Sequence, residues 1–285
     1  MTSTSPPTAP RPRRRALVIA AVAVAAVAVA GTVLAIALSG GDPAAPATAA
    51  EPTSAMPAPS AHSAAPSPSP SATAGVAPGE IVVTTTGEPI QLYARAGDAE
   101  PSEQLEEWSL YGSPTTLLGF DTQDVDGSTW IAVELVGAPN HRRAWVREAD
   151  VEVTATDVAI HVYLDEREVD LTRAGEVELT TRAVIGADES PTPVGTFWVT
   201  DPLDFSANDS GVYGAYALGL NGFSETLEEF NGGPPQIAVH GTNQPELLGE
   251  NVSNGCIRVP NDVAIELGAQ APVGTPVIVH QSRAA

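Results

Sequence analysis

The feature that most restricts the fold is a long stretch of Ala, Pro, Ser and Thr at residues 39–79, which includes "PAPSAHSAAPSPSPSATAGVAP". It shows no apolar period and has too few large apolar side chains to form a core. We therefore predict an extended, partly polyproline stalk. Globular structure must come from the roughly 200 residues that follow, which are enough for one large domain or two small ones.

An apolar run without charge, residues 16–38, comes before the stalk and directly after the basic segment "RPRRR". At about 1.5 Å per residue, such a helix spans a hydrocarbon core of about 30 Å. The run is longer than that of a usual cleavable signal peptide. We expect a cytoplasmic basic tail at residues 1–15, a transmembrane anchor at 16–38, and everything after it outside the cytoplasm. Cleavage near "ATAA" is the alternative.

The chain after the anchor is strongly acidic. The sequence has 35 Asp and Glu against 13 basic residues, all of them Arg, and a net charge of −22. Four Arg lie in "RPRRR" and no acid precedes Asp42, so the part after residue 40 carries 9 minus 35, or −26 charges. This argues against binding nucleic acid or anionic lipid through a basic surface.

Residues 80–153 alternate short β-type runs with turns, as in "IVVTTT", "PIQLYAR", "TTLLGFD" and "TWIAVEL". "DVDGSTW" supplies an Asp-Gly turn between two runs, and the pattern favours a small barrel. The segment "GAPNHRRAWVREADV" resembles the strand-turn-strand close of bacterial SH3-like domains. Trp130 and Trp145 either pack in the core or form a ligand platform. The acidic stretch "EQLEEWSLYG" is interpreted as a loop or a short helical turn.

Residues 154–282 are again mostly β. "DVAIHVYLDEREVD" alternates apolar side chains, which is typical of a half-buried strand. Further strands are expected at "EVELTTRAVIGA", "GTFWVTDP" and "GTPVIVH". "PNDVAIELGAQAP" is the clearest helix, with Asn261 as its expected N-cap. His161 and His280 lie on predicted strands and are interpreted as structural.

The segment "VSNGCIRVP" contains Cys256, the only cysteine of the chain. His240 stands sixteen residues earlier, at the end of the apolar run "IAV", and Gly241, Gly249 and Gly255 favour turns between the two. An imidazole near a thiol raises its thiolate fraction, and clustered backbone N–H groups stabilise an oxyanion. The alternative is a buried, inert cysteine. The spacing of Cys and His fits no usual metal site.

The order "HGT", then "P" and "LG", then "SNGCIRV" resembles the signature of the L,D-transpeptidases, which have the YkuD-like fold. "ESPTPVGTFWV" is similar to the family's strand entry, and "GTPVIV" to its closing strand. The resemblance covers about residues 155–280. It implies a YkuD-like β-sandwich or barrel with a short helix, preceded here by the SH3-like barrel and the transmembrane helix.

The resemblance implies a role for each matching residue. Cys256 is the expected nucleophile. His240 is the expected general base and then acid, with its imidazole oriented by the carbonyl region of Gly241. The backbone N–H groups of Asn254, Gly255 and Cys256 are expected to form the oxyanion hole. Many members of the family have His at the position of Asn254, so a second imidazole is absent from this pattern.

Other residues are expected to shape the site. Ser253 would brace the turn, and Arg258 would meet a substrate carboxylate. The family has a flap before its His, which here corresponds to about residues 210–235. The residues expected to line the pocket or contact substrate are Thr242, Asn243, Tyr213 and Tyr216, with packing as the alternative for the two tyrosines.

The resemblance implies a peptidoglycan L,D-transpeptidase that joins third-position residues of stem peptides through a cysteine thioester and releases D-alanine. Carbapenems are expected to acylate the same thiol, and no metal or organic cofactor is expected. The alternatives are an L,D-carboxypeptidase, in which water resolves the thioester, and an inactive wall-binding scaffold. The expected partners are donor and acceptor stem peptides, and the expected state is a monomer held on the cell membrane by a single span and facing the wall.

Overall fold

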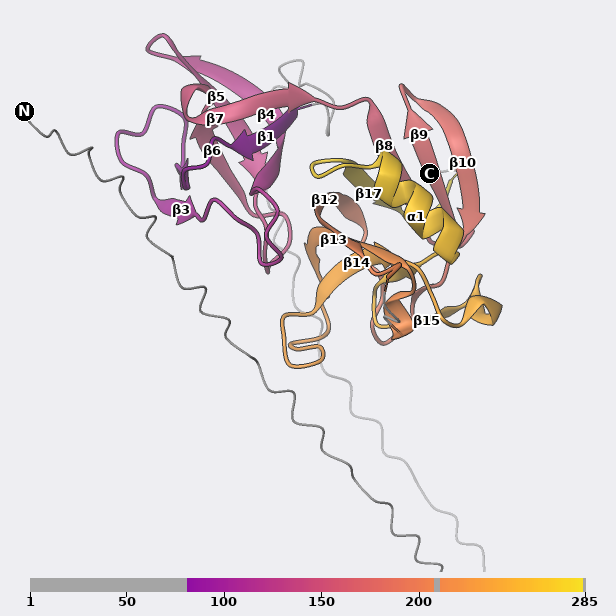
Figure 1. Ribbon diagram of the computed structural model, residues 1–285. Coiled ribbons are helices and arrows are strands. Elements are labelled where there is room, and N and C mark those ends of the chain that lie inside the picture. The colour runs from indigo at the N-terminus through magenta and orange to yellow at the C-terminus, as the bar shows by residue number, and fades with distance from the viewer. Residues whose placement is uncertain (1–80, 208–210, 284–285) are drawn as a thin grey trace, which may run out of the picture. The chain divides into compact units, whose positions relative to one another are not determined.

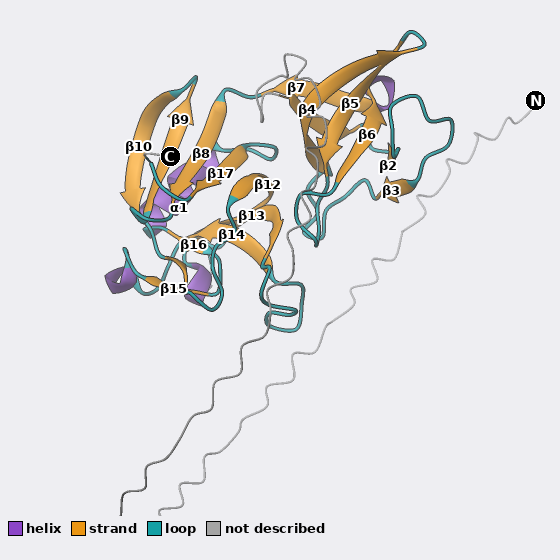
Figure 2. Cartoon of the chain, turned by 180° about the vertical axis from the view of Figure 1, so that it is seen from behind, coloured by secondary structure: helices purple, strands orange, loops and turns teal. Residues whose placement is uncertain are grey.

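The structure is a computed structural model that describes residues 81–207 and 211–283, all within one compact unit (Figure 1). The predicted tail, anchor and stalk lie outside these residues. Within the described part, no helix is long and apolar enough to cross a membrane. The described chain is mostly β with one α-helix, as the sequence predicts (Figure 2).

The first part of the fold is a five-stranded antiparallel sheet in the order β6-β5-β4-β1-β7, with a separate two-stranded sheet β2-β3. Its strands are β1 (Ile81–Thr85), β2 (Ile90–Leu92), β3 (Glu103–Leu105), β4 (Thr116–Val125), β5 (Ser128–Glu134), β6 (Arg143–Arg147) and β7 (Val151–Ala155). The 3₁₀ turn η1 (Glu148–Asp150) precedes β7.

The Asp-Gly turn predicted between two strands joins β4 to β5. Val125 pairs with Ser128, and both turn residues have positive φ, 51° at Asp126 and 79° at Gly127. A two-residue hairpin needs this backbone because it matches the twist of the strands. The SH3-like character of this sheet remains a prediction.

Trp130 packs within this first part, whereas Trp145 is only partly buried. Trp130 is 3% exposed and meets the ring of Tyr93 edge-on, with ring centres 4.9 Å apart. The guanidinium of Arg147 covers the same indole ring at 5.0 Å. Trp145 exchanges two backbone hydrogen bonds of 2.8 Å with Tyr93. The packing alternative therefore holds for Trp130, and the backbone of Trp145 pairs with that of Tyr93.

The second part is built on an eight-stranded sheet in the order β10-β9-β8-β17-β12-β13-β14-β16 (Figure 1). Two of its pairings are parallel, β8 with β17 and β14 with β16. Its strands are β8 (Val158–Tyr163), β9 (Glu168–Arg173), β10 (Glu176–Arg182), β12 (Gly195–Asp204), β13 (Tyr216–Phe223), β14 (Gln236–His240), β16 (Ile257–Arg258) and β17 (Pro276–His280). The short strands β11 (Ile185–Gly186) and β15 (Asn251–Ser253) form a parallel pair of their own.

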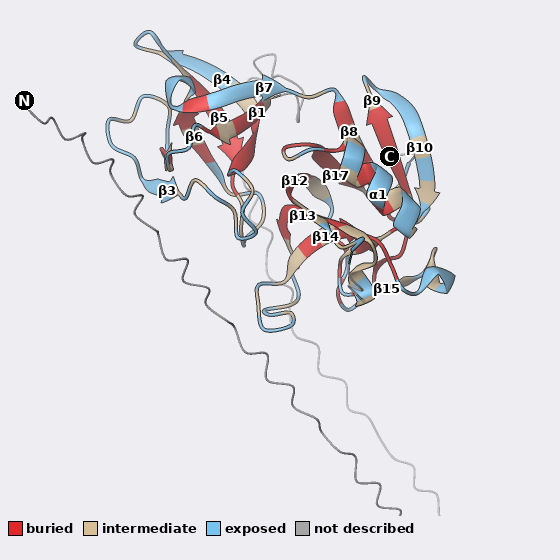
Figure 3. Ribbon diagram, viewed as in Figure 1, coloured by how far each residue is buried: buried red, intermediate tan, exposed pale blue. Residues whose placement is uncertain are grey.

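The core of this second part includes residues of the sheet and of α1 (Asn261–Gln270), and Figure 3 shows buried residues along the strands of this sheet. The alternation predicted for β8 is present: Val158, Ile160 and Val162 are buried and the residues between them are not. The predicted N-cap is wrong, because Pro260 caps α1 without a side-chain hydrogen bond and Asn261 is the first helical residue. The side chain of Asn261 is used elsewhere, as described below.

Trp198 of β12 links the two sheets. Its side chain is fully buried, and it belongs to the apolar core of the first sheet although its strand belongs to the second. Its indole N–H donates to the carbonyl of Thr116 at 2.8 Å. Asn140 adds a two-way contact, because its side chain both donates to and accepts from the backbone of Phe223, at 2.8 and 2.9 Å. A buried indole and a satisfied amide pair hold the two sheets in a defined arrangement.

Candidate active site

Cys256 lies in the turn between β15 and β16 and is half-buried. The residue before it, Gly255, has φ +106°, a backbone conformation that costs little only for glycine. A Cβ atom there would also lie 2.9 Å from Ile237 Cδ1. The glycine before the cysteine is therefore required both by the backbone angle and by the close approach of β14.

Ser253 braces this turn from inside. Its hydroxyl is in a side chain only 1% exposed, donates to the carbonyl of Cys256 at 2.6 Å and accepts from the N–H of Gly255 at 3.2 Å. Thr192 adds a hydrogen bond of 2.9 Å to the carbonyl of Gly255. The Gly255 N–H was expected in the oxyanion hole. Because it is engaged by Ser253, the N–H groups of Asn254 and Cys256 are left as the candidates.

His240 ends β14 and is 3% exposed. Its Nδ1 lies 2.6 Å from the carbonyl oxygen of Gly241. A carbonyl can only accept, so Nδ1 carries the proton and Nε2 of the neutral ring is an acceptor. Burial lowers the pKa of His240 to about 4, although the hydrogen bond to Gly241 opposes that shift. The imidazole is therefore neutral near pH 7 and has the tautomer of a general base.

The parallel pairing of β14 and β16 brings the imidazole and the thiol to one site. His240 stands directly opposite Arg258, and Cys256 is two residues before Arg258. Cys256 and His240 both line a small cavity of about 30 Å³, together with Asn254 and Arg258. In the described part of the chain the two side chains form no direct hydrogen bond, and the thiol contacts the carbonyl of Gln236 at 4.0 Å.

Burial raises the pKa of the Cys256 thiol, while the backbone of Ala238 and the charge of Arg258 oppose the rise. The resting pair is therefore a neutral thiol and a neutral imidazole rather than an ion pair. Such a nucleophile needs a base during the attack itself. Catalytic hydrogen bonds often form only in the reacting complex, so a base role for His240 does not require a direct hydrogen bond to the resting thiol.

Arg258 has spare binding capacity. Its Nε atom is buried and has no hydrogen-bond partner among the described residues. A buried donor without a partner costs about 1–3 kcal/mol, which is recovered when a ligand supplies the acceptor. The side chain lines the small cavity beside Cys256. It is therefore suited to bind an anionic group of a substrate.

Asn261 is a site residue that sequence reasoning missed, because it was interpreted only as a helix cap. Its Oδ1 accepts from the N–H groups of Ala215 and Thr242 at 3.1 and 2.9 Å, and its Nδ2 donates to the carbonyl of Thr242 at 3.0 Å. A Cβ atom on Gly214 or Gly241 would lie 2.1 Å from Asn261 Oδ1. This amide clamps the backbone that follows His240 to the segment that contains Tyr213.

The two candidate tyrosines have different surroundings. Tyr213 lines both cavities at Cys256, and its ring meets that of His240 with centres 5.1 Å apart. For Tyr216 the packing alternative holds: its ring lies against α1, where a Cβ on Gly268 would be 2.3 Å from it. The predicted flap, residues 210–235, is also not one loop, because β13 lies inside it.

Thr242 and Asn243 were predicted to line the pocket, and this prediction is wrong for both cavities at Cys256. Thr242 is 2% exposed and its hydroxyl accepts from the N–H of Gln244 at 3.0 Å. Its role is therefore within the turn after His240. Asn243 is exposed beyond that turn.

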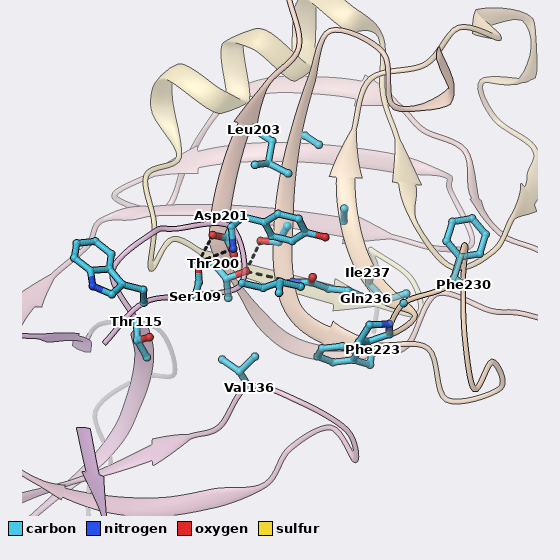
Figure 4. A pocket seen from close by; sticks show the side chains of 18 of the residues that line it. Ser109, Thr115, Val136, Thr200, Asp201, Leu203, Phe223, Phe230, Gln236 and Ile237 are labelled. Carbon is cyan, nitrogen blue, oxygen red and sulfur yellow. Dashed lines mark hydrogen bonds between the residues drawn. The ribbon is translucent and has the colours of Figure 1, made fainter. Parts of the chain in front are cut away.

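A second and larger cavity, of about 700 Å³, also reaches Cys256 (Figure 4). One of its walls is formed by strands β12, β13 and β14, with Asp201, Gln236 and Ile237 on it. Another wall comes from residues of the first sheet, among them Ser109, Thr115 and Val136. In the described chain no group of three or more His, Cys, Asp or Glu side chains is placed to hold a metal ion.

A cysteine beside a neutral, tautomer-fixed histidine, between two cavities, is the arrangement of an acyl-transfer site. Comparison with known proteins agrees. Residues 157–279 match the family model of the YkuD L,D-transpeptidase catalytic domain. Residues 157–279, which include Cys256 and His240, are therefore similar to a YkuD catalytic domain.

Curated relatives cover the same region. One relative is YkuD of Bacillus subtilis, which is described as a candidate L,D-transpeptidase. It is 30% identical over 122 residues, which are 43% of this chain and 65% of that protein. YqjB of the same species is 30% identical over 118 residues, or 39% of this chain and 52% of that protein. The chain thus spans 52 to 65% of the length of these relatives.

Solved structures resemble the chain over the same or a larger part. An L,D-transpeptidase from Mycobacterium tuberculosis is 17% identical, with a TM-score of 0.40, and covers 70% of this chain and 96% of its own. The catalytic domain of an E. faecium L,D-transpeptidase is 26% identical, with a TM-score of 0.33, and covers 44% of this chain and 97% of its own.

Proposed function

We propose that the protein is a peptidoglycan L,D-transpeptidase that uses Cys256 as its nucleophile and His240 as its general base and acid. The family match supports an enzyme of this kind. The observation that carries the proposal is the fixed tautomer of His240. Its Nδ1–H is held by Gly241, and the ring lines the same small cavity as Cys256.

In the first half of the reaction, the Cys256 thiol passes its proton to His240 Nε2 while sulfur attacks a carbonyl carbon of the donor stem. That carbonyl joins the third-position diamino acid to D-alanine. The C–N bond then breaks, His240 returns the proton to the departing amine, and D-alanine leaves. A thioester on Cys256 remains, and all atoms and charges balance.

Two groups would stabilise charge during this step. The backbone N–H groups of Asn254 and Cys256 would face the developing oxyanion, because the turn braced by Ser253 fixes the local backbone. The unpartnered Nε of Arg258 would bind the carboxylate of the departing D-alanine. This role would explain why a guanidinium is kept partly buried beside the thiol.

In the second half, the side-chain amine of an acceptor stem attacks the thioester carbonyl. His240 takes the proton from that amine, the C–S bond breaks, and His240 passes the proton to the departing sulfur, which restores the thiol of Cys256 and the neutral imidazole. The product is a cross-link between two third-position residues. These steps move only protons and an acyl group, so the proposal invokes no cofactor.

The proposed location follows from the sequence alone. A single span at residues 16–38 would hold the protein on the cell membrane, and the stalk at 39–79 would carry the described part toward the wall. The proposed assembly state is a monomer.

The deciding experiment is incubation of the protein with a carbapenem, followed by intact-mass measurement. We expect one covalent adduct on the wild type, none on Cys256→Ala, and slow formation on His240→Gln. A folded wild type that takes up no adduct would contradict the proposal and favour a scaffold without chemistry. Product analysis with a tetrapeptide stem then separates transfer from hydrolysis, because a carboxypeptidase would release D-alanine without forming a cross-link.

A further inference from the structure

The loop that joins β3 to β4, residues 106–115, belongs to the first sheet but forms a wall of the large cavity that contains Cys256. From the sequence, the overlapping stretch 103–112 was interpreted as a loop or a short helical turn, whereas its first three residues form β3. Its residues on the cavity are Glu106, Trp108, Ser109, Leu110, Tyr111 and Pro114. The first sheet therefore contributes side chains to the same cavity as the proposed nucleophile.

The loop has a defined internal structure centred on Ser109. Its hydroxyl accepts from the N–H groups of Tyr111 and Ser113 at 3.3 and 3.0 Å, and its own N–H donates to the carbonyl of Ser113 at 2.8 Å. At the base of the loop, the hydroxyl of Thr115 donates to the backbone carbonyl of Glu106 at 2.6 Å. Its N–H donates to the backbone carbonyl of Glu107 at 3.0 Å.

The same serine attaches the loop to the YkuD-like region, residues 157–279. Its hydroxyl donates to the carboxylate of Asp201, a β12 side chain that is 2% exposed, as Figure 4 shows. One hydroxyl proton and two accepted hydrogen bonds use the full capacity of this group. Next to the loop, Trp198 of β12 donates to Thr116 at 2.8 Å from within the first core. The wall is thus held at a set place relative to Cys256.

This loop exposes apolar side chains that a free surface does not favour. Trp108, Leu110 and Tyr111 are 56%, 77% and 54% exposed. Consecutive large apolar side chains at the edge of a cavity indicate a binding surface. Tyr111 and Tyr213 line the same large cavity. The exposed surface is therefore continuous with the ring that packs on His240.

The charges around Cys256 have opposite signs on its two sides. The charged residues that line the large cavity are Glu106 and Asp201, both acidic. Asp201 is bonded to Ser109, whereas the carboxylate of Glu106 forms no ion pair within the described residues. The small cavity contains Arg258 instead. The large cavity is therefore suited to a cationic ligand, and the small one to an anion.

We propose that the loop 106–115 is the acceptor-recognition element of this enzyme: Glu106 attracts the side-chain amine of the acceptor stem in its protonated form, which releases that proton to water before the neutral amine attacks, and Trp108 and Tyr111 contact that stem beside it. The inference rests on the proposed transpeptidase function. It assigns the first sheet a part in substrate selection, and it makes the acceptor half of the reaction dependent on residues outside the YkuD-like region.

The test uses the full-length chain, a tetrapeptide donor stem and an acceptor stem with a free side-chain amine. Cross-linked product is measured by mass spectrometry at several acceptor concentrations, and carbapenem acylation is measured in parallel because it needs no acceptor. For Glu106→Gln we expect the acceptor KM to rise about fivefold, which is the range of one exposed ion pair. Acylation of Cys256 should keep its wild-type rate.

Glu107→Gln is the matched control, because Glu107 is the neighbouring carboxylate and does not line the cavity. Its acceptor KM should equal that of the wild type. Raised salt should increase the KM of the wild type and of Glu107→Gln but have less effect on Glu106→Gln, since screening weakens an exposed ion pair. Trp108→Ala should raise the KM at every salt concentration.

Three outcomes would overturn the inference: an unchanged acceptor KM in Glu106→Gln, an equal rise in Glu107→Gln, or an equal loss of acylation in the loop variants. The first denies the contact, the second shows a general surface-charge effect, and the third shows that the loop acts on the nucleophile. Failure of the proposed function is distinct from all of these, because the wild type itself would then release no D-alanine or form no cross-link.

Discussion

The Nδ1 atom of His240 lies 2.6 Å from the carbonyl oxygen of Gly241, the next residue in the chain. This contact places the ring proton on Nδ1 and leaves Nε2 as the basic nitrogen without help from a carboxylate. It needs the backbone after β14 to turn sharply, and Asn261 holds that turn through two hydrogen bonds to Thr242. The proposed chemistry therefore depends on one amide side chain that touches neither sulfur nor imidazole.

The pH dependence of acylation should show the low pKa of His240. Because burial lowers that pKa to about 4, the imidazole remains a base well below the ordinary histidine range. We expect the rate of carbapenem acylation to stay nearly constant from pH 8 to pH 5.5 and to fall to half near pH 4. Stopped-flow or quenched mass measurements give this profile. A half-point near 6.5 would show an exposed, unperturbed imidazole instead.

The same pKa predicts a pH dependence of stability. The folded-state pKa is about 4 and the unfolded value 6.5, so the unfolded chain binds the extra proton between these values. The contribution of His240 is complete above pH 6.5 and is lost as the pH falls through 4, by roughly 3 kcal/mol. Urea unfolding at pH 7 and pH 4.5 measures it. His240→Gln should lose distinctly less stability over this interval than the wild type, and equal losses would refute the assignment.

Gly255→Ala should damage both stability and acylation. The substitution forces a side chain into φ +106° and puts Cβ at 2.9 Å from Ile237 Cδ1, next to Cys256. We expect a loss of about 1–3 kcal/mol in unfolding free energy and a fall in acylation rate of at least tenfold. Gly87→Ala is the matched control, since φ is +98° there and nothing lies within 4 Å of the new Cβ. It should lose stability and keep its acylation rate.

Asn261→Ala should reduce acylation by loosening the backbone around His240. It removes the hydrogen bonds to the backbones of Ala215 and Thr242. Leaving these backbone groups without partners should lower the free energy of unfolding by about 1–3 kcal/mol. We expect the rate to fall about tenfold or more at a temperature where the variant is still folded, judged by circular dichroism. Asn261→Asp keeps the acceptor for the two N–H groups but loses the donor to Thr242. A rate intermediate between wild type and Asn261→Ala supports the positioning role, whereas rates equal to wild type in both variants would exclude it.

Local patterns in the sequence determined much of this protein: the mostly β character, the Asp-Gly hairpin at residues 126–127, and Cys256 with His240 as a candidate pair. These signals are short-range, because strand alternation, turn residues and a motif around one thiol are properties of a few neighbouring residues. The same patterns left the use of Tyr216 open and gave a wrong use for Asn261. A tyrosine near a predicted flap or an asparagine before a helix has several uses that local sequence does not distinguish.

Tertiary structure decided the rest. Only the parallel pairing of β14 with β16 brings His240 opposite Arg258, and only burial gives the imidazole its low pKa. Only packing brings the loop 106–115 to the cavity of Cys256, through contacts between residues about ninety positions apart, such as Ser109 with Asp201. Such contacts depend on how the sheets pack and on which groups become desolvated. Both are determined only when segments distant in the sequence come together.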